Sequence, residues 1–431
     1  MKAYPSPGAG AAAIAAGSAP PAAAPLVMPV AILGGGPIGL VCALLLARHG
    51  QPSTLVDARP VEALQRDRRL LALSRGTLDV LEPLLGKGFA PLGEIHRIHV
   101  SSSGNLGSAQ LGSRDFGGVA VGATVWYADM VAALARAAQA QPLITVQRPR
   151  RALEVRQRVH TVDVVLDDGT VLHGPLAIDA EGTPPQGRDA AQMALLAELD
   201  LPGPAGDAIE RFTAQGPLAL LPLPRPAGTG TSDSAGNTTR MSMVWCLPAA
   251  LARSRRDLPE SELCALIAQA LGPRLGRPSA VGPRSTFPLL THRLDRICEH
   301  RLVHLGNAAQ SLHPVAGQGF NLGIRDCVCL VECLAEAPIA SIATIGTRGM
   351  AGEPVLAQAG LADPLRALQL YARRRRLDRT LFPALTNALP RVFSSSLPPV
   401  VLARSAALLG LDLLPMLRRP FTRILMYGAP R

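Results

Sequence analysis

The sequence predicts an α/β protein: a Rossmann-type dinucleotide-binding domain, an inserted and mostly antiparallel sheet, and a C-terminal helical segment. Three observations predict this class. A glycine-rich turn at residues 34–39 stands between an apolar run and a helical pattern. Between residues 192 and 287, short strand-like runs are separated by Pro and Gly. From residue 363 onward the pattern is helical, with an apolar stretch at 400–414.

The N-terminal elements form one β-α-β unit of about thirty residues, the setting that a dinucleotide fingerprint requires. Residues 26–33 predict a short apolar strand, and the glycine turn follows it. Residues 40–49 predict a helix, and residues 53–56 predict a second strand that ends at Asp57. The spacing therefore places the turn and Asp57 at the same edge of a parallel sheet.

Each residue type in this unit suits a nucleotide. Gly34 permits the tight turn, Gly36 lets the main chain approach a pyrophosphate, and Gly39 allows close packing of helix on strand. The helix N-terminus offers free N–H groups and a positive dipole to the phosphates. Asp57 can accept hydrogen bonds from a ribose, which favours an unphosphorylated ribose and hence FAD or NAD.

The rest of the chain predicts a discontinuous domain arrangement. Asp168 and Gly169 lie between two alternating runs, which is a strong hairpin signal. Residues 67–85 predict a loop entering a helix, and residues 128–140 predict an Ala-rich helix. We expect loops at 225–240 and 338–362, the second of them a candidate lid. The predicted division is a disordered Ala/Pro-rich tail at 1–27, a nucleotide-binding domain at 28–94, 128–190 and 285–362, a substrate domain at 95–127 and 191–284, and a helical region at 363–431.

Composition argues against several classes of protein. The net charge is +11, but the arginines are scattered and only 3% of residues are aromatic, so a nucleic-acid partner is not expected. Seven cysteines without a CxxC pair predict neither a disulfide framework nor a metal site, and they suit a reducing cytoplasm. The sequence contains no uninterrupted run of about 18 apolar residues, so no membrane-spanning helix is expected. The arginine surplus beside apolar stretches favours an anionic membrane surface.

A second glycine-rich segment follows the strand predicted at 301–305. Residues 306–326 read GNAAQSLHPVAGQGFNLGIRD. Gly317, Gln318 and Gly319 would let main chain approach a planar ring, and the helix that follows directs its positive end toward that ring. Such a dipole stabilises the negative charge of a reduced flavin.

This segment resembles the second flavin motif of the aromatic hydroxylase flavoproteins, and most of all that of the ubiquinone-biosynthesis hydroxylases, the 2-octaprenyl-6-methoxyphenol hydroxylase family. The variant residues Asn307 and His313 are similar to that ring-hydroxylase group. Further similarity extends over nearly the whole ordered chain: the segment around Arg69, the residues 210–222, and the C-terminal helix pattern of Tyr371, Arg375 and Asp378.

The resemblance implies a glutathione-reductase-like FAD-binding domain and adds residues to the cofactor site. Those residues are Arg69, Glu181, Asn307, Pro314, Gly317, Gln318, Gly319 and Asn321. Glu181 departs from the family, which has Asp in its Ala-Asp-Gly segment, and the extra methylene of Glu181 changes the geometry expected there. His313 is the candidate catalytic residue: it either assists phenol deprotonation and orients substrate, or only shapes the loop before Pro314.

The resemblance also implies a reaction. NADH or NADPH would dock transiently and reduce FAD, O2 would form a flavin C4a-hydroperoxide, and its distal oxygen would hydroxylate a polyprenyl phenol in ubiquinone biosynthesis. The implied place is the cytoplasm, peripheral to the inner face of the bacterial plasma membrane, with contact through the C-terminal region or within a quinone-biosynthesis complex. Two alternatives stay open: a flavin-dependent prenyl-lipid reductase, and a non-catalytic flavoprotein subunit of such a complex.

Overall fold

The fold is taken from a computed structural model that describes most of the 431-residue chain. The described residues are 28–86, 89, 91–104, 107–182, 190–202, 206–223, 238–313, 317–336 and 364–429. The N-terminal tail, most of the loop expected at 225–240 and the candidate lid at 338–362 lie outside them. Residues Thr238 to Arg240, which we expected in the loop, instead begin a strand.

A six-stranded sheet forms the centre of the first domain. Its order is β19 (Cys298–Glu299), β20 (Leu302–His304), β12 (Ala177–Asp179), β1 (Val30–Leu33), β2 (Ser53–Val56) and β8 (Ile144–Gln147). All neighbours pair in parallel except β19 with β20. Strands β1 and β2 are buried throughout, as expected for parallel strands covered on both faces.

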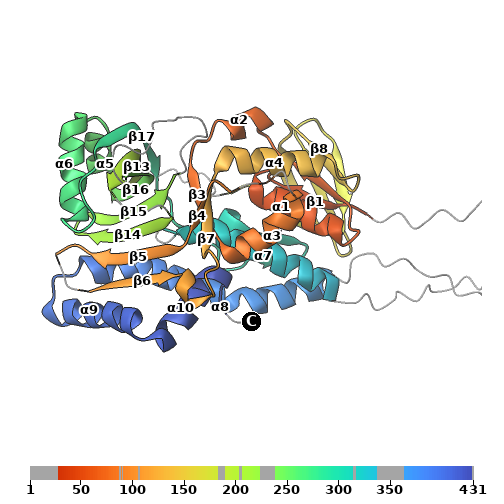
Figure 1. Ribbon diagram of the computed structural model, residues 1–431. Helices are drawn as coiled ribbons and strands as arrows, with labels where there is room; N and C mark the ends of the chain where they lie inside the picture. The colour runs from red at the N-terminus through yellow and green to blue at the C-terminus, as the bar shows by residue number, and fades with distance from the viewer. Residues whose placement is uncertain are drawn as a thin grey trace, which may run out of the picture.

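Helices cover one face of this sheet, and a small sheet covers the other. Helices α1 (Pro37–Arg48), α4 (Tyr127–Gln139) and α7 (Gln318–Glu336) share one apolar core with β1 and β2 (Figure 1). On the opposite face lie β9 (Ala152–Gln157), β10 (Val162–Leu166) and β11 (Val171–Gly174). Strands β10 and β11 are antiparallel and connect through Asp168 and Gly169, which confirms the predicted hairpin. The β1-α1-β2 unit and these layers confirm the Rossmann-type fold.

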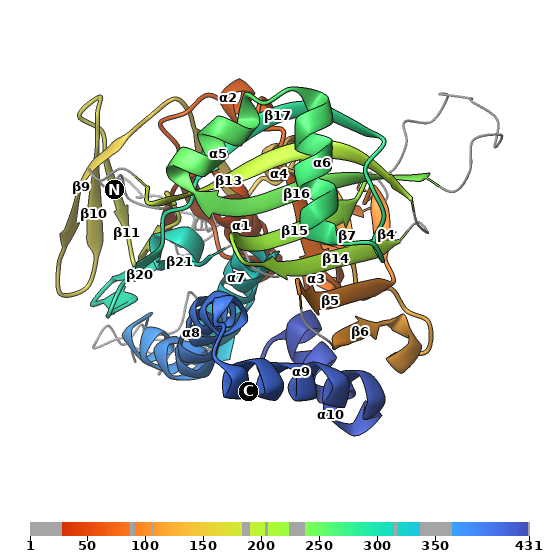
Figure 2. The same cartoon turned by 90° about the vertical axis from the view of Figure 1, so that its left-hand side faces the viewer.

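The second domain is a seven-stranded, mostly antiparallel sheet. Its order is β17 (Ala280–Pro288), β13 (Gln192–Pro202), β16 (Thr238–Pro248), β15 (Gly216–Pro222), β14 (Asp207–Thr213), β5 (Arg97–Ser102) and β6 (Ser108–Gly112). Helices α5 (Ala249–Arg256) and α6 (Glu260–Leu271) pack on the face turned away from the first domain (Figures 1 and 2). The opposite face of this sheet points toward the first domain.

A three-stranded sheet joins the two domains. Strand β7 (Gly122–Trp126) lies between β3 (Leu70–Ser74) and β4 (Gly93–Ile95). We expected a loop entering a helix over 67–85, but Leu70–Ser74 is a strand that pairs with β7, and only α3 (Arg75–Leu85) is helical. Helix α2 (Val61–Gln65) and the short pair β18 (His292–Arg293) and β21 (Gln310–Ser311) complete the domain.

The chain ends in three helices, which confirms the predicted helical segment: α8 (Pro364–Ser394), α9 (Pro398–Leu413) and α10 (Pro415–Tyr427). They lie beneath both domains (Figures 1 and 2). Within the described ranges, no single helix has both the length and the apolar composition to cross a membrane. Helices α9 and α10, which meet at 94°, satisfy those two criteria only when they are taken together.

Candidate functional site

The first glycine turn lies at the edge of the parallel sheet with one side open. Gly34 has φ +99°, and a Cβ there would stand 2.4 Å from the carbonyl oxygen of Ala180. A Cβ on Gly39 would stand 1.9 Å from the carbonyl oxygen of Gly34. Gly36 differs, because its backbone is extended and the nearest described atom to an added Cβ is Nη2 of Arg59, at 3.9 Å. Packing therefore requires Gly34 and Gly39, whereas Gly36 leaves space for a group that approaches from outside.

The N-terminus of α1 has the features of an anion-binding site. Gly36 is its N-cap, no side chain caps it, and Pro37 occupies the first turn. No acidic residue stands in that turn. The first main-chain N–H groups are thus left to an outside acceptor, and the helix dipole favours negative charge there. A diphosphate fits this open and positively polarised edge.

Asp57 ends β2 as predicted and holds the turn. The buried carboxylate accepts hydrogen bonds from the main-chain N–H of Gly35 at 2.8 Å and of Arg59 at 2.8 Å. The Arg59 guanidinium lies 3.2 Å from it, and Nη2 of Arg148 lies 3.5 Å away. Asp57 therefore fixes the glycine turn in addition to facing the place expected for a ribose.

Arg59 and Arg148 are site residues that the sequence did not single out. Arg148 follows β8, and the parallel pairing of β8 with β2 brings it beside Asp57, where it also donates to the carbonyl oxygen of Gly35. Burial lowers the pKa of Arg148 from its ordinary value, although it stays a cation at neutral pH. The position of Arg59, two residues after Asp57, was the one available signal. The two arginines supply the charge that a diphosphate needs.

The two glycine segments meet at Ile38 in the first turn of α1. A Cβ on Gly306 would lie 3.1 Å from Cγ1 of Ile38, and one on Gly323 would lie 2.7 Å from its Cδ1. The Cys327 thiol donates to the carbonyl oxygen of Ile38 at 3.4 Å. Segments almost three hundred residues apart thus form one continuous wall. Gly306 and Gly323 are therefore both required by this close approach.

The start of α7, together with Gly317 before it, is open among the described residues in the way that a planar ring requires. Gly317 has φ +58°, in the left-handed region that favours glycine, and a Cβ there would be 3.5 Å from the Cβ of Ala72. No described atom lies within 4 Å of a Cβ added to Gly319. Nε2 of Gln318 donates to the carbonyl oxygen of Leu425 at 3.4 Å, which ties the loop to α10. Pro314, also expected in the site, lies outside the described residues.

Asn321 supports this loop from beneath. Its buried side-chain amide donates to the carbonyl oxygens of Ala72 and Gly317, both at 3.0 Å, and its Oδ1 accepts from the N–H of Ser74 at 2.9 Å. The hydrogen bonds to Ala72 and Ser74 hold α7 against β3, and the one to Gly317 holds the residue that precedes the helix. Asn321 therefore stabilises the start of α7, and a direct contact between Asn321 and FAD stays a prediction. Asn307, by contrast, is exposed.

Arg69 bridges the two domains. Its Nε is 2.9 Å from Oδ1 of Asp67, and its guanidinium lies over the rings of Tyr127, at 5.0 Å, and Phe287, at 4.6 Å. Phe287 belongs to β17 of the seven-stranded sheet. Stacking of a guanidinium on two rings contributes about 0.5–1 kcal/mol per ring at an exposed site. Arg69 therefore lies where the first domain and the seven-stranded sheet meet.

Glu181 follows β12, at the same edge as Asp57. Its N–H donates to Oδ1 of Asp179 at 3.0 Å, and the Asp179 carboxylate also pairs with His304 at 2.7 Å. Desolvation, and then the charges of Asp179 and Asp57, raise the pKa of the Glu181 carboxyl above its ordinary value. A third carboxylate thus adds unfavourable charge to the edge where an anionic diphosphate is expected.

Replacing Glu181 by Gln should therefore stabilise the protein. Because the pKa is raised in the folded state, the charged carboxylate destabilises the fold above that pKa, and the penalty disappears as pH falls to the unfolded value of 4.5. We expect E181Q to raise the melting temperature by roughly 1–2 °C at pH 7.5, since solvent screens most of the charge. The gain should shrink toward pH 4.5 in thermal melts. A gain that is constant with pH would contradict the electrostatic cause.

His313 lies between the flavin loop and the sheet. It is buried, and its Nε2 is 3.3 Å from Oε1 of Gln192 in β13. Burial lowers its pKa below the ordinary 6.5, so the imidazole is neutral at pH 7. With Nε2–H donating to Gln192, the Nδ1 lone pair is free, and no described partner reaches it. A neutral ring with a free Nδ1 can accept a proton.

A variant separates the two readings of His313. We expect H313Q to lower kcat about 100-fold, the contribution usual for a general base. In the wild-type protein, kcat/KM should fall as pH drops through the lowered pKa, since protonation consumes the base. In H313Q this acidic limb should vanish. Retention of the limb in the variant would assign it to another group and leave His313 a residue that shapes the loop.

Buried ion pairs connect α8 to the second glycine segment. Asp326 accepts from the N–H of Gly306 at 3.2 Å and from Nε of Arg375 at 2.7 Å. Arg375 also pairs with Asp378, whose Oδ1 accepts from the N–H of Ala429 at 3.1 Å. The sequence indicated Arg375 and Asp378 only as part of a helix pattern. In the structure, Arg375 pairs with both Asp378 and Asp326, and Asp326 in turn accepts the hydrogen bond from the N–H of Gly306.

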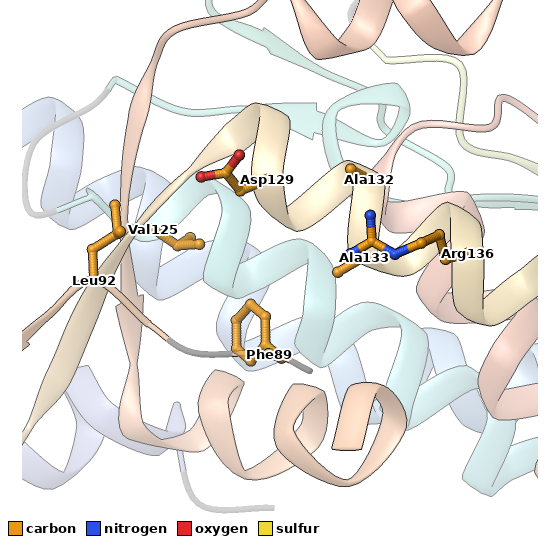
Figure 3. A pocket seen from close by; sticks show the side chains of 7 residues that line it. All are labelled: Phe89, Leu92, Val125, Asp129, Ala132, Ala133 and Arg136. Carbon is orange, nitrogen blue, oxygen red and sulfur yellow. The ribbon is translucent and has the colours of Figure 1, made fainter. Parts of the chain in front are cut away.

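One cavity of about 200 Å³ lies apart from these residues. It is lined by Phe89, Leu92, Val125 and the α4 residues Asp129, Ala132, Ala133 and Arg136 (Figure 3). None of the predicted site residues borders it. Among the described residues, no group of three or more His, Cys, Asp or Glu side chains could hold a metal ion.

Comparison with known proteins gives the family. A family model described as FAD binding domain matches residues 27–338. The chain is 30% identical to ubiquinone hydroxylase UbiL of Rhodospirillum rubrum, over 95% of this chain and 93% of that protein. It is 27% identical to the 3-demethoxyubiquinol 3-hydroxylase of Escherichia coli, over 90% of this chain and 96% of that one.

Solved structures agree on the fold. The chain superimposes on PqsL, a probable FAD-dependent monooxygenase from Pseudomonas aeruginosa, with a TM-score of 0.65 and 19% identity. The match covers 89% of this chain and 99% of that one. These findings confirm the predicted FAD cofactor and the predicted resemblance. The chain belongs to the FAD-binding-domain family of hydroxylases, together with the ubiquinone-biosynthesis hydroxylases.

Proposed function

We propose that this protein is an FAD-dependent monooxygenase that hydroxylates the aromatic ring of a polyprenyl phenol in ubiquinone biosynthesis, with NADH or NADPH and O2 as co-substrates. One observation carries the proposal. The open glycines Gly317 and Gly319 at the start of α7 follow His313 closely along the chain, and the imidazole of His313 contacts Gln192 on the inserted sheet. The residues expected to bind the flavin, a proton acceptor and strand β13 of the inserted sheet are therefore neighbours.

The residues present fit FAD. Main chain at Gly36 and the free N-terminus of α1 would hold the diphosphate, with Arg59 and Arg148 beside it. Residues 317–319 at the start of α7 would accept the flavin ring, and the α7 dipole would favour its negative edge. When bound, FAD supplies the redox chemistry, accepting hydride from a nicotinamide and activating O2 for insertion of one oxygen atom.

The inserted sheet offers an apolar row to the substrate. Leu196, Val244 and Ala219 are direct neighbours across β13, β16 and β15. The residues that alternate with them pack under α5 and α6, so these three point to the opposite face, toward the cofactor domain. All three are half-buried. Such a row suits a ring with a prenyl tail and limits the access of water.

His313 would act on the phenol. An electron-rich ring becomes a better nucleophile when its hydroxyl loses a proton. Nδ1 of the neutral imidazole can take that proton, while Gln192 holds Nε2–H and fixes the tautomer. The role requires the ring of the substrate to lie between the 317–319 loop and the Leu196 row.

Consumption of reduced nicotinamide tests the proposal. The purified protein loaded with FAD should oxidise NADH or NADPH slowly alone, and at least tenfold faster with a prenylated phenol that has a free ring position. A rate of NADH or NADPH oxidation that does not change when the phenol is added would indicate a non-catalytic flavoprotein subunit. A product with one C=C bond reduced and no new hydroxyl would indicate a prenyl-lipid reductase.

The place of action follows from the proposed substrate. A polyprenyl phenol resides in a bilayer, so we infer a peripheral position at the cytoplasmic face of the plasma membrane, alone or within a quinone-biosynthesis complex. Deletion of the gene should cause a prenylated phenol lacking one hydroxyl to accumulate. An unchanged quinone pool would count against the pathway.

A further inference from the structure

Helices α9 and α10 are amphipathic, but two of their arginines, Arg404 and Arg418, face the protein, and several of their leucines face solvent. Arg404 and Arg418 are 7% and 6% exposed. In contrast, Leu402, Leu413 and Met416 are 73%, 71% and 76% exposed. Long apolar side chains at the surface are ordinary when single, but a contiguous group of them marks an interaction surface.

Polar contacts fix this orientation of the helices. Nη1 of Arg404 donates to three main-chain carbonyl oxygens at the end of α8, at 2.7–2.9 Å. Arg418 binds Asp115 through two hydrogen bonds of 2.7 and 2.9 Å. Asp412 accepts from the N–H of Gln110 at 3.1 Å. A rotation that buried the leucines would break these contacts, so the outward apolar face belongs to the fold.

The exposed residues form one surface. Leu402, Leu409 and Leu413 are spaced by seven and four residues, which places them on one side of α9. Met416 and Leu417 continue it across the 94° bend into α10. We define the apolar docking surface as the exposed side chains of Leu402, Leu409, Leu413, Leu414, Met416 and Leu417.

The charged residues around this surface indicate which kind of partner binds it. Residues 391–429 contain five arginines and one acidic residue, Asp412, which is already held by Arg114 and Gln110. Arg419 is 63% exposed at its side chain, and Arg391 and Arg423 are exposed as well. An apolar face bordered by cations with no free carboxylate complements an anionic bilayer surface.

We propose that α9 and α10 dock on an anionic lipid bilayer, with the leucines and Met416 at the acyl boundary and Arg419 and Arg423 at the lipid phosphates. The C-terminal end of α10 lies next to the second flavin motif. Leu425 of α10 accepts the hydrogen bond from Gln318, and a Cβ on Gly76 would lie 2.8 Å from the carbonyl oxygen of Met426. Docking would therefore bring the site close to a lipid-borne substrate, a consequence that rests on the proposed function.

Vesicle sedimentation of the full FAD-loaded chain tests the docking. Binding is compared between vesicles of phosphatidylglycerol with phosphatidylcholine and vesicles of phosphatidylcholine alone. The wild type should bind the anionic vesicles, with salt weakening the binding. The double variant L413Q/M416Q should lose at least about tenfold in affinity. R419Q/R423Q should lose about fivefold per arginine.

Substitutions of exposed apolar residues elsewhere on the protein serve as matched controls. Leu153 and Val159 are 63% and 71% exposed on the β9–β10 hairpin, away from α9 and α10 (Figure 2). L153Q/V159Q should bind vesicles as the wild type does, and all variants should keep FAD and the same melting temperature. No wild-type binding, or equal binding by L413Q/M416Q, overturns the proposal, as does a dimer in solution that L413Q/M416Q dissociates. Vesicle binding without turnover of any prenylated phenol would overturn only the proposed function.

Discussion

Replacement of Gly36 by Val is expected to abolish FAD binding while the fold stays intact. Gly36 has φ −72° and ψ −179°, which any residue adopts, and no described atom lies closer than 3.9 Å to an added Cβ. A valine would fill the space that a diphosphate needs and block the N–H groups of α1. We expect G36V to weaken FAD binding at least about 100-fold, equivalent to roughly 3 kcal/mol, by fluorescence titration.

Two glycine variants serve as controls for G36V. G410A lies inside α9, where the nearest side-chain atom is 4.0 Å from the added methyl, and should bind FAD normally. G39A places a methyl 1.9 Å from the carbonyl oxygen of Gly34 and should lower the melting temperature as well as FAD affinity. If G36V binds FAD as the wild type does, the diphosphate lies elsewhere.

Replacement of Arg375 by Met is expected to destabilise the protein and to release FAD. The side chains of Arg375 and Asp326 are 5% and 2% exposed, so R375M would leave a buried carboxylate without its partner. Breaking one side of a buried pair costs about 3–5 kcal/mol. Asp326 also holds the N–H of Gly306 in the second flavin motif. We therefore expect a lower denaturation midpoint in urea and faster loss of FAD on dilution.

The neighbouring Arg374 provides the matched control. It pairs with Glu336 at 2.6 Å, but the two side chains are 28% and 51% exposed. R374M should cost no more than about 1 kcal/mol, as is usual for a solvent-exposed pair, and should retain FAD. Equal effects of R375M and R374M would mean that α8 does not support the flavin motif through Asp326.

The elements that sequence patterns predicted are those with local causes. The turn at Gly34, the hairpin at Asp168 and Gly169, and helix α4 each depend on residues that are close along the chain. Strand β3 was missed because its partner β7 begins about fifty residues later, and no local alternation marks it. Pairing with β7 makes residues Leu70–Ser74 a strand.

The site divides in the same way. The two glycine segments were recognised because their spacing is local, but the arginine at 148 reaches Asp57 only through parallel pairing of β8 with β2. The hydrogen bonds of Asn321 to Ala72 and Ser74 likewise require the packing of α7 on β3. Such contacts between distant segments are set by tertiary structure, and a single sequence does not reveal them.

The origin of the oxygen atom tests the central claim most directly. The FAD-loaded protein is given NADH or NADPH, a prenylated phenol and 18O2 in ordinary water, and the product is analysed by mass spectrometry. A hydroxylating monooxygenase predicts one 18O atom on the aromatic ring of each product molecule. A product that carries only 16O from water, or that forms equally well without O2, would contradict the account.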